Sequence, residues 1–432
     1  MSPKEPVTTT PLSAPKQSPA PGMLRVVARA PTFAALRFRE YRLIFGAQLG
    51  NSMVVNMDQV ARGWLMYDLT GSTVQLGLVT SVKIVPGLLL APIAGVMADR
   101  YDRRIQLIAA QSLSATMNLL LAILILTGLV APWHLYATGL VVAIVQVFEI
   151  PARQSLLGES VDRAFLTNAI GLNSIVNNVC RSLGPAVAGG LIAVVGPGAS
   201  YAVQGLIYVF SIMWTVQLRL ASRASTMRVA TGSIWAGTVE GWRYIGGNPA
   251  IRGSMTMLML VAVFGTSFVA IFPALAKDVL NVDSTGQGLL VTGLGMGALV
   301  SAILLATHGD RVPKGKFMLA GGILFGIGQV AVGLSSWFAV SFALMVALGI
   351  CSVTCTALIN TVIQGHAAQH MRGRVMSMFQ QGQVATTLGG LLIGALAAIV
   401  GVQWAIVIMG IGCVLGVIVV GLAMPEVRAI KQ

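Results

Sequence analysis

Long apolar runs separated by short polar and charged stretches set the hydropathy pattern of this chain of 432 residues. Each run has roughly 18–25 residues, the length with which an α-helix crosses about 30 Å of hydrocarbon. The strands of a membrane barrel would be about ten residues long and would alternate in polarity, so the pattern excludes a barrel. We predict twelve spanning helices at residues 43–66, 74–97, 105–126, 133–150, 168–195, 199–218, 255–275, 289–306, 317–334, 338–359, 375–400 and 404–424.

The composition supports the same fold class. Charged residues make up 10% of the chain and apolar residues 56%, and the mean hydropathy is +0.82. A soluble protein would carry about a quarter charged residues. The chain is therefore expected to be an all-α integral membrane protein.

The net charge of +14 could suggest a nucleic-acid partner, but the positions of the 28 Lys and Arg residues argue against it. With the N-terminus inside, nearly all of them fall in the tails and in the loops on the inner side, and only Lys277 falls in an outer loop. Such a bias fixes membrane orientation, so both termini are predicted to be cytoplasmic. The bilayer is the expected partner, and nucleic acid is not.

The chain is expected to divide into five parts. Residues 1–32 form a cytoplasmic tail, disordered where Pro, Ser and Thr dominate and basic further on. Helical bundles are predicted at residues 33–218 and 252–424. A basic cytoplasmic loop at 219–251 joins them, and a cytoplasmic tail at 425–432 follows.

A dense charge cluster after the second apolar run recurs in weaker form half a chain later. The first copy contains Gly95, Asp99, Arg100, Arg103 and Arg104. The second copy begins with Asp310 and Arg311, and both copies share the order Asp-Arg-x-x-(Arg/Lys). A feature repeated at this spacing predicts two related halves.

Six plus six helices with these charged loops resemble the major facilitator superfamily. The signature loop of that family reads Gly-x-x-x-Asp-(Arg/Lys)-x-x-(Gly)-(Arg/Lys)-(Arg/Lys). The first charge cluster matches this loop, except that Asp102 stands where glycine is common. Residues 38–43, 64–72 and 151–155 are most similar to the enterobactin-exporter and macrolide-efflux-like branch. The resemblance implies two pseudo-symmetric six-helix bundles that work by alternating access. It also implies that the charged loops are gates: Asp99 would face a helix N-terminus, with Asp310 as its counterpart. Neighbouring arginines would pair with carboxylates such as Glu159 or Asp162.

The fifth predicted helix carries Gly184, Pro185, Gly189 and Gly190, which is similar to the Gly-Pro-x-x-Gly-Gly signature of exporters, with Ala188 in place of one glycine. A proline bends a helix and small residues allow close approach of a neighbour. An ordinary tight helix crossing explains the segment equally well. The arginine motif that exporters carry in the fourth helix is absent from residues 133–140.

Charges inside membrane helices are costly and indicate function by default. Asp58, Lys83 and Arg181 lie on three predicted helices, each about 20 Å from the inner face, and Arg62 follows one turn after Asp58. In one interpretation Asp58 neutralises Arg62, while the other two cations snorkel or bind carbonyls. In the other, Asp58 accepts a proton, and Lys83 or Arg181 contacts an anionic or catechol-like substrate.

The second half offers no comparable buried charge. Gln329 and Asn360 are the polar residues assigned there to the substrate cavity, although packing is an alternative role. Glu149 and Arg153, four residues apart in the first half, are expected to form a structural pair.

No enzyme, cofactor or metal is expected. His366 and His370 have a metal-binding spacing but lack a third ligand, and no phosphate-binding loop of the Gly-x-x-x-x-Gly-Lys-(Ser/Thr) type is present. The predicted function is export of a small siderophore-like or drug-like amphiphile across the plasma (inner) membrane by a monomeric, proton-coupled secondary transporter. An importer, a lipid or metabolite transporter, and a non-transporting sensor or scaffold are the alternatives.

Overall fold

The computed structural model describes residues 31–84, 86–87, 89–90, 93–94, 97, 101–219, 234–308, 312–368, 371–382 and 385–430. Within these ranges the regular secondary structure is helical and contains no strand, which confirms the all-α prediction. Nine of the described helices are long and apolar enough to cross a membrane. The chain is a multi-pass membrane protein, and the count of twelve spans stays a prediction.

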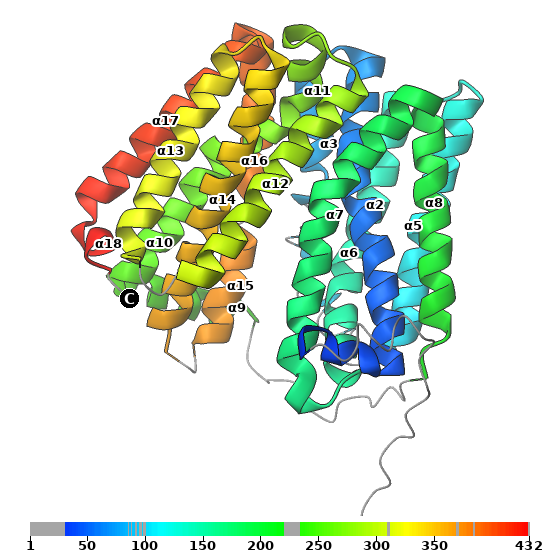
Figure 1. Ribbon diagram of the computed structural model, residues 1–432, viewed down its shortest axis with the longest axis horizontal. Helices are drawn as coiled ribbons and strands as arrows, with labels where there is room; N and C mark the ends of the chain where they lie inside the picture. Colours follow the sequence, from blue (N-terminus) through cyan, green and yellow to red (C-terminus); the bar gives the residue numbers. More distant parts are fainter. Residues whose placement is uncertain are drawn as a thin grey trace, which may run out of the picture.

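The N-terminal half is a bundle of long helices (Figure 1). In chain order its elements are η1 (Pro31–Arg37), α2 (Arg39–Thr70), α3 (Thr73–Ser81), α5 (Arg103–Leu126), α6 (Pro132–Glu159), η2 (Arg163–Phe165), α7 (Leu166–Val195) and α8 (Pro197–Val216). Helix α5 packs against α6 and α8, and α2 packs against α7 and α8. Helix α2 is not among the nine helices that are apolar enough to span a membrane, because polar and charged residues lower its mean hydropathy. Several of these residues are buried inside the protein.

The C-terminal half forms the second bundle. Its elements are α9 (Ile234–Gly247), α10 (Pro249–Leu260), η3 (Val261–Gly265), η4 (Thr266–Ile271), α11 (Phe272–Ala274), η5 (Leu275–Val279), α12 (Ser284–His308), α13 (Lys314–Leu334), α14 (Phe338–His366), α15 (Arg372–Gly382), α16 (Ala385–Val400), α17 (Val402–Ala423) and α18 (Pro425–Ala429). The segment predicted as the central loop, residues 219–251, thus contains α9, and its residues 220–233 lie outside the described ranges.

The first span of the C-terminal half is irregular. Between α10 and η5 the chain passes through π and 3₁₀ turns before α11, which begins next to Pro273. Such turns interrupt the regular hydrogen bonding of a helix and are frequent at functional sites. Five consecutive residues of η4, 266–270, line the space between the two halves.

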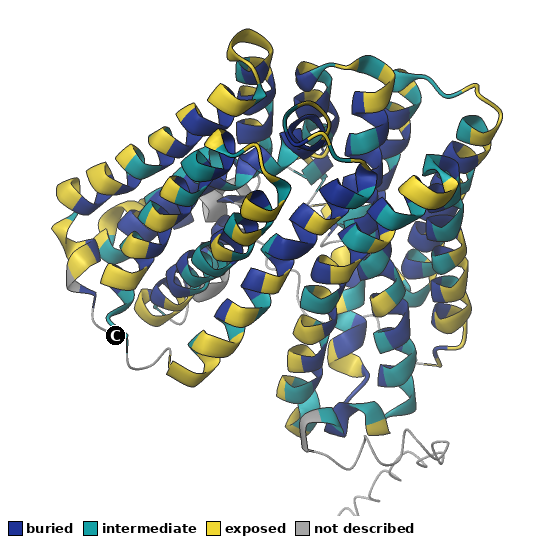
Figure 2. Cartoon of the chain, turned by 45° about the horizontal axis from the view of Figure 1, so that its top comes forward, coloured by how far each residue is buried: buried dark blue, intermediate teal, exposed yellow. Residues whose placement is uncertain are grey.

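The two halves stand side by side and contact each other through α7 with α12 and through α3 with α16 (Figure 1). We call the end that carries α11 the α11 end, and the opposite end, with η1 and α18, the η1 end. The halves diverge toward the η1 end. Figure 2 shows exposed residues along the outer faces of the helices and buried ones between them, as expected where lipid covers the outside.

Glycines allow the halves to meet backbone to backbone. A Cβ on Gly77 of α3 would lie 2.7 Å from the carbonyl oxygen of Gly390 in α16. A Cβ on Gly189 of α7 would lie 2.3 Å from the carbonyl oxygen of Ser284 in α12. Any larger residue at these positions would push the halves apart, because both distances are well below van der Waals contact.

Candidate functional site

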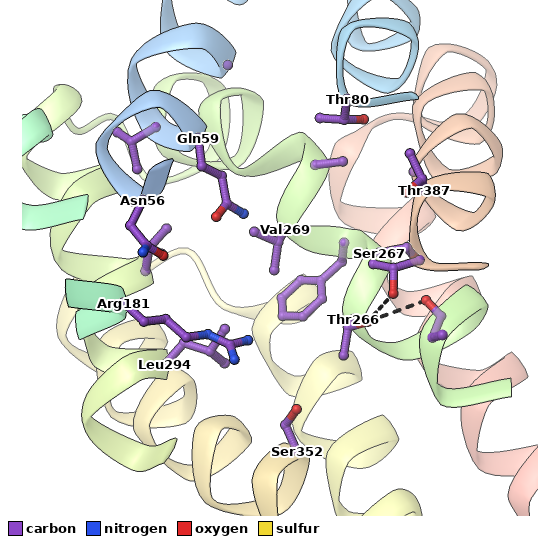
Figure 3. Close-up of a pocket in the computed structure, with 18 of the residues that line it drawn as sticks. Asn56, Gln59, Thr80, Arg181, Thr266, Ser267, Val269, Leu294, Ser352 and Thr387 are labelled. Atoms are coloured by element: carbon purple, nitrogen blue, oxygen red, sulfur yellow. Dashed lines mark hydrogen bonds between the residues drawn. The ribbon is translucent and has the colours of Figure 1, made fainter. Parts of the chain in front are cut away.

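A cavity of about 500 Å³ lies between the two halves. Helices α2, α3 and α7 form its wall on the N-terminal side. On the C-terminal side the wall comes from α10, η3, η4, α11, α12, α13, α14 and α16. Figure 3 shows Asn56, Gln59 and Arg181 on one side of this space, with Thr266, Ser267 and Thr387 on the other.

Asp58 and Arg62 form a buried salt bridge in the N-terminal wall. The Nη2 of Arg62 donates to Oδ1 of Asp58 at 2.8 Å, and Nε reaches both carboxylate oxygens at 3.1 and 3.2 Å. The Nη1 of Arg62 donates to the carbonyl of Leu135 at 2.7 Å and to the hydroxyl of Thr138 at 3.0 Å, both on α6. The interpretation in which Asp58 neutralises Arg62 therefore describes the observed geometry.

Lys83 and Arg181 have a different environment. Both line the cavity and both are exposed to it. Among the described residues neither cation has a hydrogen-bond or salt-bridge partner, and Arg181 extends from α7 toward the centre of the space near Leu294 (Figure 3). Because Arg62 is already neutralised by Asp58, the cavity carries two uncompensated positive charges. Low-dielectric walls concentrate such a field and attract anions.

The C-terminal wall is apolar with scattered hydroxyl groups. Its polar members are Thr266, Ser267, Gln287, Ser352, Thr356, Thr386 and Thr387, and its larger apolar members are Leu258, Val261, Phe268, Val291, Leu294 and Phe325. Sequence reasoning did not single out these residues. Ser and Thr in helices commonly bond their own backbone, as Ser267 does with the carbonyl of Val263 at 2.5 Å, so they give little sequence signal.

Gln329 and Asn360 were assigned to the cavity from sequence, and the structure places both outside its lining. Gln329 is fully buried within the C-terminal bundle, where its Nε2 donates to the carbonyl of Phe264 at 3.1 Å. The side-chain oxygen of Asn360 accepts from Gln364 at 2.7 Å. Both amides are bonded to neighbours in their own half, so this part of the prediction needs correction.

The glycines and proline of α7 have distinct environments. A Cβ on Gly184 would lie 2.8 Å from the Cβ of Asn56, so this glycine serves packing within the N-terminal half. Gly189 and the carbonyl of Pro185 contact α12, across the boundary between halves. Gly190 has open space around it. The motif therefore combines a close crossing within one half with a close crossing between halves.

The charged loop after the second predicted span is partly described. Asp102 caps α5 by accepting from the backbone N–H of Arg104 at 2.8 Å. Arg103 forms a salt bridge with Glu159, as the sequence led us to expect, and Arg104 donates to the carbonyl of Val216. Five further predicted gating residues lie outside the described ranges: Gly95, Asp99, Arg100, Asp310 and Arg311.

At the α11 end, side chains connect the two halves. The Nζ of Lys277 lies 2.8 Å from Oδ1 of Asp68, and the hydroxyl of Tyr67 donates to Asp278. Deeper in, the hydroxyl of Ser284 donates to the carbonyl of Gly189 at 3.1 Å. These bonds join the two halves at the α11 end.

Comparisons with known proteins agree with this architecture. A family model described as transmembrane secretion effector matches residues 30–432. The staphyloferrin A transporter of Staphylococcus aureus is 25% identical over 367 residues, which cover 82% of this chain and 89% of the relative. The multidrug efflux pump Tap of Mycolicibacterium fortuitum is 26% identical over 83% and 88% of the two chains. Macrolide efflux protein A of Streptococcus pyogenes is 21% identical over 64% and 68%.

Solved structures resemble the fold. A bacterial homologue of the human lysosomal transporter Spinster, in an inward-facing and unoccupied conformation, superposes with a TM-score of 0.70 at 14% identity and covers 93% of this chain and 97% of that one. The fold and the efflux-like branch predicted from the sequence are thus confirmed. The chain belongs to the transmembrane secretion effector family, an efflux-like branch of the major facilitator superfamily of transporters.

Proposed function

We propose that this transporter exports an anionic amphiphile, siderophore-like in its chemistry, by proton-coupled alternating access. The observation that carries the proposal is a pair of cations, Lys83 and Arg181, that have no partner within the described part of the chain. They lie in a cavity whose opposite wall is apolar with scattered hydroxyl groups. An anionic group would bind the two cations. The apolar body of the same molecule would contact residues such as Phe268 and Phe325.

The charge balance of the cavity favours an anion over a cationic drug. Two unit charges about 4 Å apart interact with about 4 kcal/mol at an effective dielectric constant near 20. A cationic ligand would meet this repulsion from Lys83 or Arg181, while Asp58 offers little compensation because Arg62 occupies both of its oxygens. A neutral ligand would leave both cavity cations unpaired.

The direction of transport is inferred from the bonds that join the two halves at the α11 end. The bonds of Lys277 and Tyr67 across the halves favour access from the η1 end. Lys and Arg residues concentrate in the predicted inner loops and tails of the sequence, and the described residues Arg37 and Arg39 lie at the η1 end. The positive-inside rule therefore assigns that end, and with it both termini, to the cytoplasm. A cavity of this orientation would load substrate from the cytoplasm, and the transporter would reside in the plasma (inner) membrane.

Proton exchange would supply the driving force. A full cycle needs one conformation that binds the anion and another that releases it, and a proton taken up on the outside can favour the second. Both halves of the chain supply residues to the cavity, and we infer that a monomer carries out this cycle. The residues we assign to substrate are Lys83 and Arg181.

Inside-out vesicles with an acidified interior test the proposal. The vesicles contain the wild type, Lys83→Gln or Arg181→Gln. One of three compounds is then added to the outside: 2,3-dihydroxybenzoate, a macrolide or a cationic dye. We expect the catecholate anion to release protons from wild-type vesicles, and each variant to reduce the release at least tenfold, because a hydrogen bond to a charged group contributes about 1.5–3 kcal/mol. Lys316→Gln, which removes an exposed charge at the η1 end, is the matched control.

Two outcomes would contradict the proposal. Release by the cationic dye alone would show that the cavity selects cations. Release by the catecholate that survives in both variants would show that Lys83 and Arg181 do not bind it.

A further inference from the structure

A second buried ion pair lies in the N-terminal half, outside the lining of the cavity. Glu149 of α6 is 1% exposed and forms a salt bridge with Arg153, one turn further along the same helix. Only Oε1 of Glu149 takes part. No donor in the described part of the chain reaches Oε2, although this oxygen is buried. A buried carboxylate oxygen without a donor is costly, so it requires an explanation.

Arg153 does not depend on Glu149 alone. Its Nη1 donates to Oε1 of Gln48 on α2 at 2.6 Å. With the amide of Asn51 turned so that its oxygen faces Arg153, that oxygen accepts from the two guanidinium nitrogens at 2.8 and 2.9 Å, and the amide nitrogen donates to Tyr208 at 3.2 Å. The guanidinium is therefore shared between α6 and α2.

The amides of α2 continue this network toward the cavity. The Nε2 of Gln48 donates to Oδ1 of Asn177 at 2.8 Å, and the hydroxyl of Ser52 donates to the same oxygen at 2.6 Å. Asn177 precedes Arg181 by one turn of α7, and residues at this spacing share a helix face. Asn56, which lines the cavity, donates to the carbonyl of Ser52 at 2.7 Å. A continuous set of hydrogen bonds thus runs from Glu149 to α7, next to the cavity cation.

We propose that Glu149, and not Asp58, is the carboxylate that carries the exchanged proton. This inference deepens the proposed function and rests on it. A proton from water adds to Oε2 without displacing any donor. A proton on Asp58 would have to displace Arg62, because Arg62 donates to both oxygens there.

Protonation of Glu149 changes the balance at Arg153. The neutral acid attracts the guanidinium less, so Arg153 is held mainly by the amide oxygens of Gln48 and Asn51. A shift of Arg153 toward α2 acts on Gln48 and through it on Asn177. Proton uptake then alters the position of the α7 face that carries Arg181, and proton return to water restores it.

Glu149 is the carboxylate of this network, and the groups around it are of other kinds. Arg153 of its own helix supplies a guanidinium, which has donors and no acceptor. Tyr208 of α8 supplies a phenol hydroxyl. Helix α2 presents the neutral amides of Gln48 and Asn51, and α5 presents Ser114 beside Tyr208.

Infrared difference spectroscopy of the purified chain in lipid tests the assignment without any substrate. Spectra are recorded between mildly acidic and alkaline buffer, where exposed carboxylates with pKa values near 4 stay ionised. We expect a carbonyl band of a protonated carboxylic acid in the wild type, its loss in Glu149→Gln and its retention in Asp58→Asn. Arg153→Lys should shift the band, which keeps the test informative if Glu149→Gln fails to fold.

Loss of the band in Asp58→Asn, or its persistence in Glu149→Gln, would overturn the assignment. In vesicles, Glu149→Gln should still exchange labelled 2,3-dihydroxybenzoate for unlabelled but lose accumulation driven by a pH difference. If the anion is not transported at all, the infrared result still stands, so failure of the proposed function and failure of the Glu149 assignment are distinguishable.

Discussion

The two buried ion pairs of the N-terminal half look alike in sequence and differ in structure. Asp58–Arg62 and Glu149–Arg153 both join residues four apart on a long helix. In the first pair both carboxylate oxygens accept from the arginine, whose Nη1 donates to two acceptors on α6. In the second pair one carboxylate oxygen has no donor among the residues that the structure describes, and the arginine is shared with α2.

We infer from this difference that the first pair stabilises the structure and that the second pair changes its bonding with protonation. A pair whose bonds are all made within a rigid unit gains nothing from a change of protonation. A pair with a free oxygen and a shared cation has two arrangements of similar bonding, which is what a bistable element needs. The depth of Asp58 in the membrane is therefore not sufficient to identify it, and not Glu149, as the carboxylate that exchanges protons.

The largest effect is expected from Asp58→Ala. The variant leaves the guanidinium of Arg62 buried and without its counter-charge, which costs about 3–5 kcal/mol. Thermal unfolding in detergent should show a large fall in midpoint, while the double variant Asp58→Leu/Arg62→Met should recover most of it. A double variant as unstable as the single one would show that Asp58 contributes something other than charge balance.

Asn177→Leu should uncouple the second pair from the cavity. It removes the acceptor shared by Gln48 and Ser52, and each unsatisfied donor costs about 1–3 kcal/mol. We expect the affinity for 2,3-dihydroxybenzoate to depend on pH by roughly tenfold in the wild type, a typical coupling, and to be nearly independent of pH in the variant. Equal pH dependence in both proteins would place the coupling outside this network.

Thr138→Val probes the support of the first pair. The change removes one acceptor of Arg62 and should lower the free energy of unfolding by about 0.5–1.5 kcal/mol without altering the pH dependence of transport. Thr116→Val is the matched control, because Thr116 is exposed and bonds only its own helix. A changed pH profile in Thr138→Val alone would assign a switching role to the first pair.

The smallest effect is expected from the exposed pair at the α11 end. The side chains of Lys277 and Asp68 are 46% and 53% exposed, so their attraction is worth at most about 1 kcal/mol. A cysteine introduced at Ser352, which lines the cavity, reports access from the α11 side. Asp68→Asn should raise the rate of its labelling only slightly, and high salt should have the same effect without the Asp68 substitution. An increase of tenfold or more would mean that this pair is the main lock.

The sequence predicted the membrane fold from its long apolar runs and the two halves from the repeated charged loop. It predicted the charged wall of the cavity because charged residues are rare within apolar runs. Asp58, Arg62, Lys83 and Arg181 do line one cavity. It failed for Gln329 and Asn360, since helices that are apolar all round do not reveal which face meets the cavity. The contrast between Gly189 and Gly190, and the free oxygen of Glu149, depend on neighbours distant in sequence, so no local pattern could indicate them.

Equilibrium binding of 2,3-dihydroxybenzoate and of its neutral amide to the purified transporter tests the central claim most directly. The two probes share the catechol ring, and the amide replaces the anionic carboxylate by a neutral group of similar size. Calorimetry compares their binding to the wild type, to the double variant Lys83→Gln/Arg181→Gln and to the control Lys316→Gln. We predict that the wild type and the control bind the anion at least about ten times more tightly than the amide, and that the double variant binds both equally. Equal binding by the wild type, or a preference that survives in the double variant, would contradict the account.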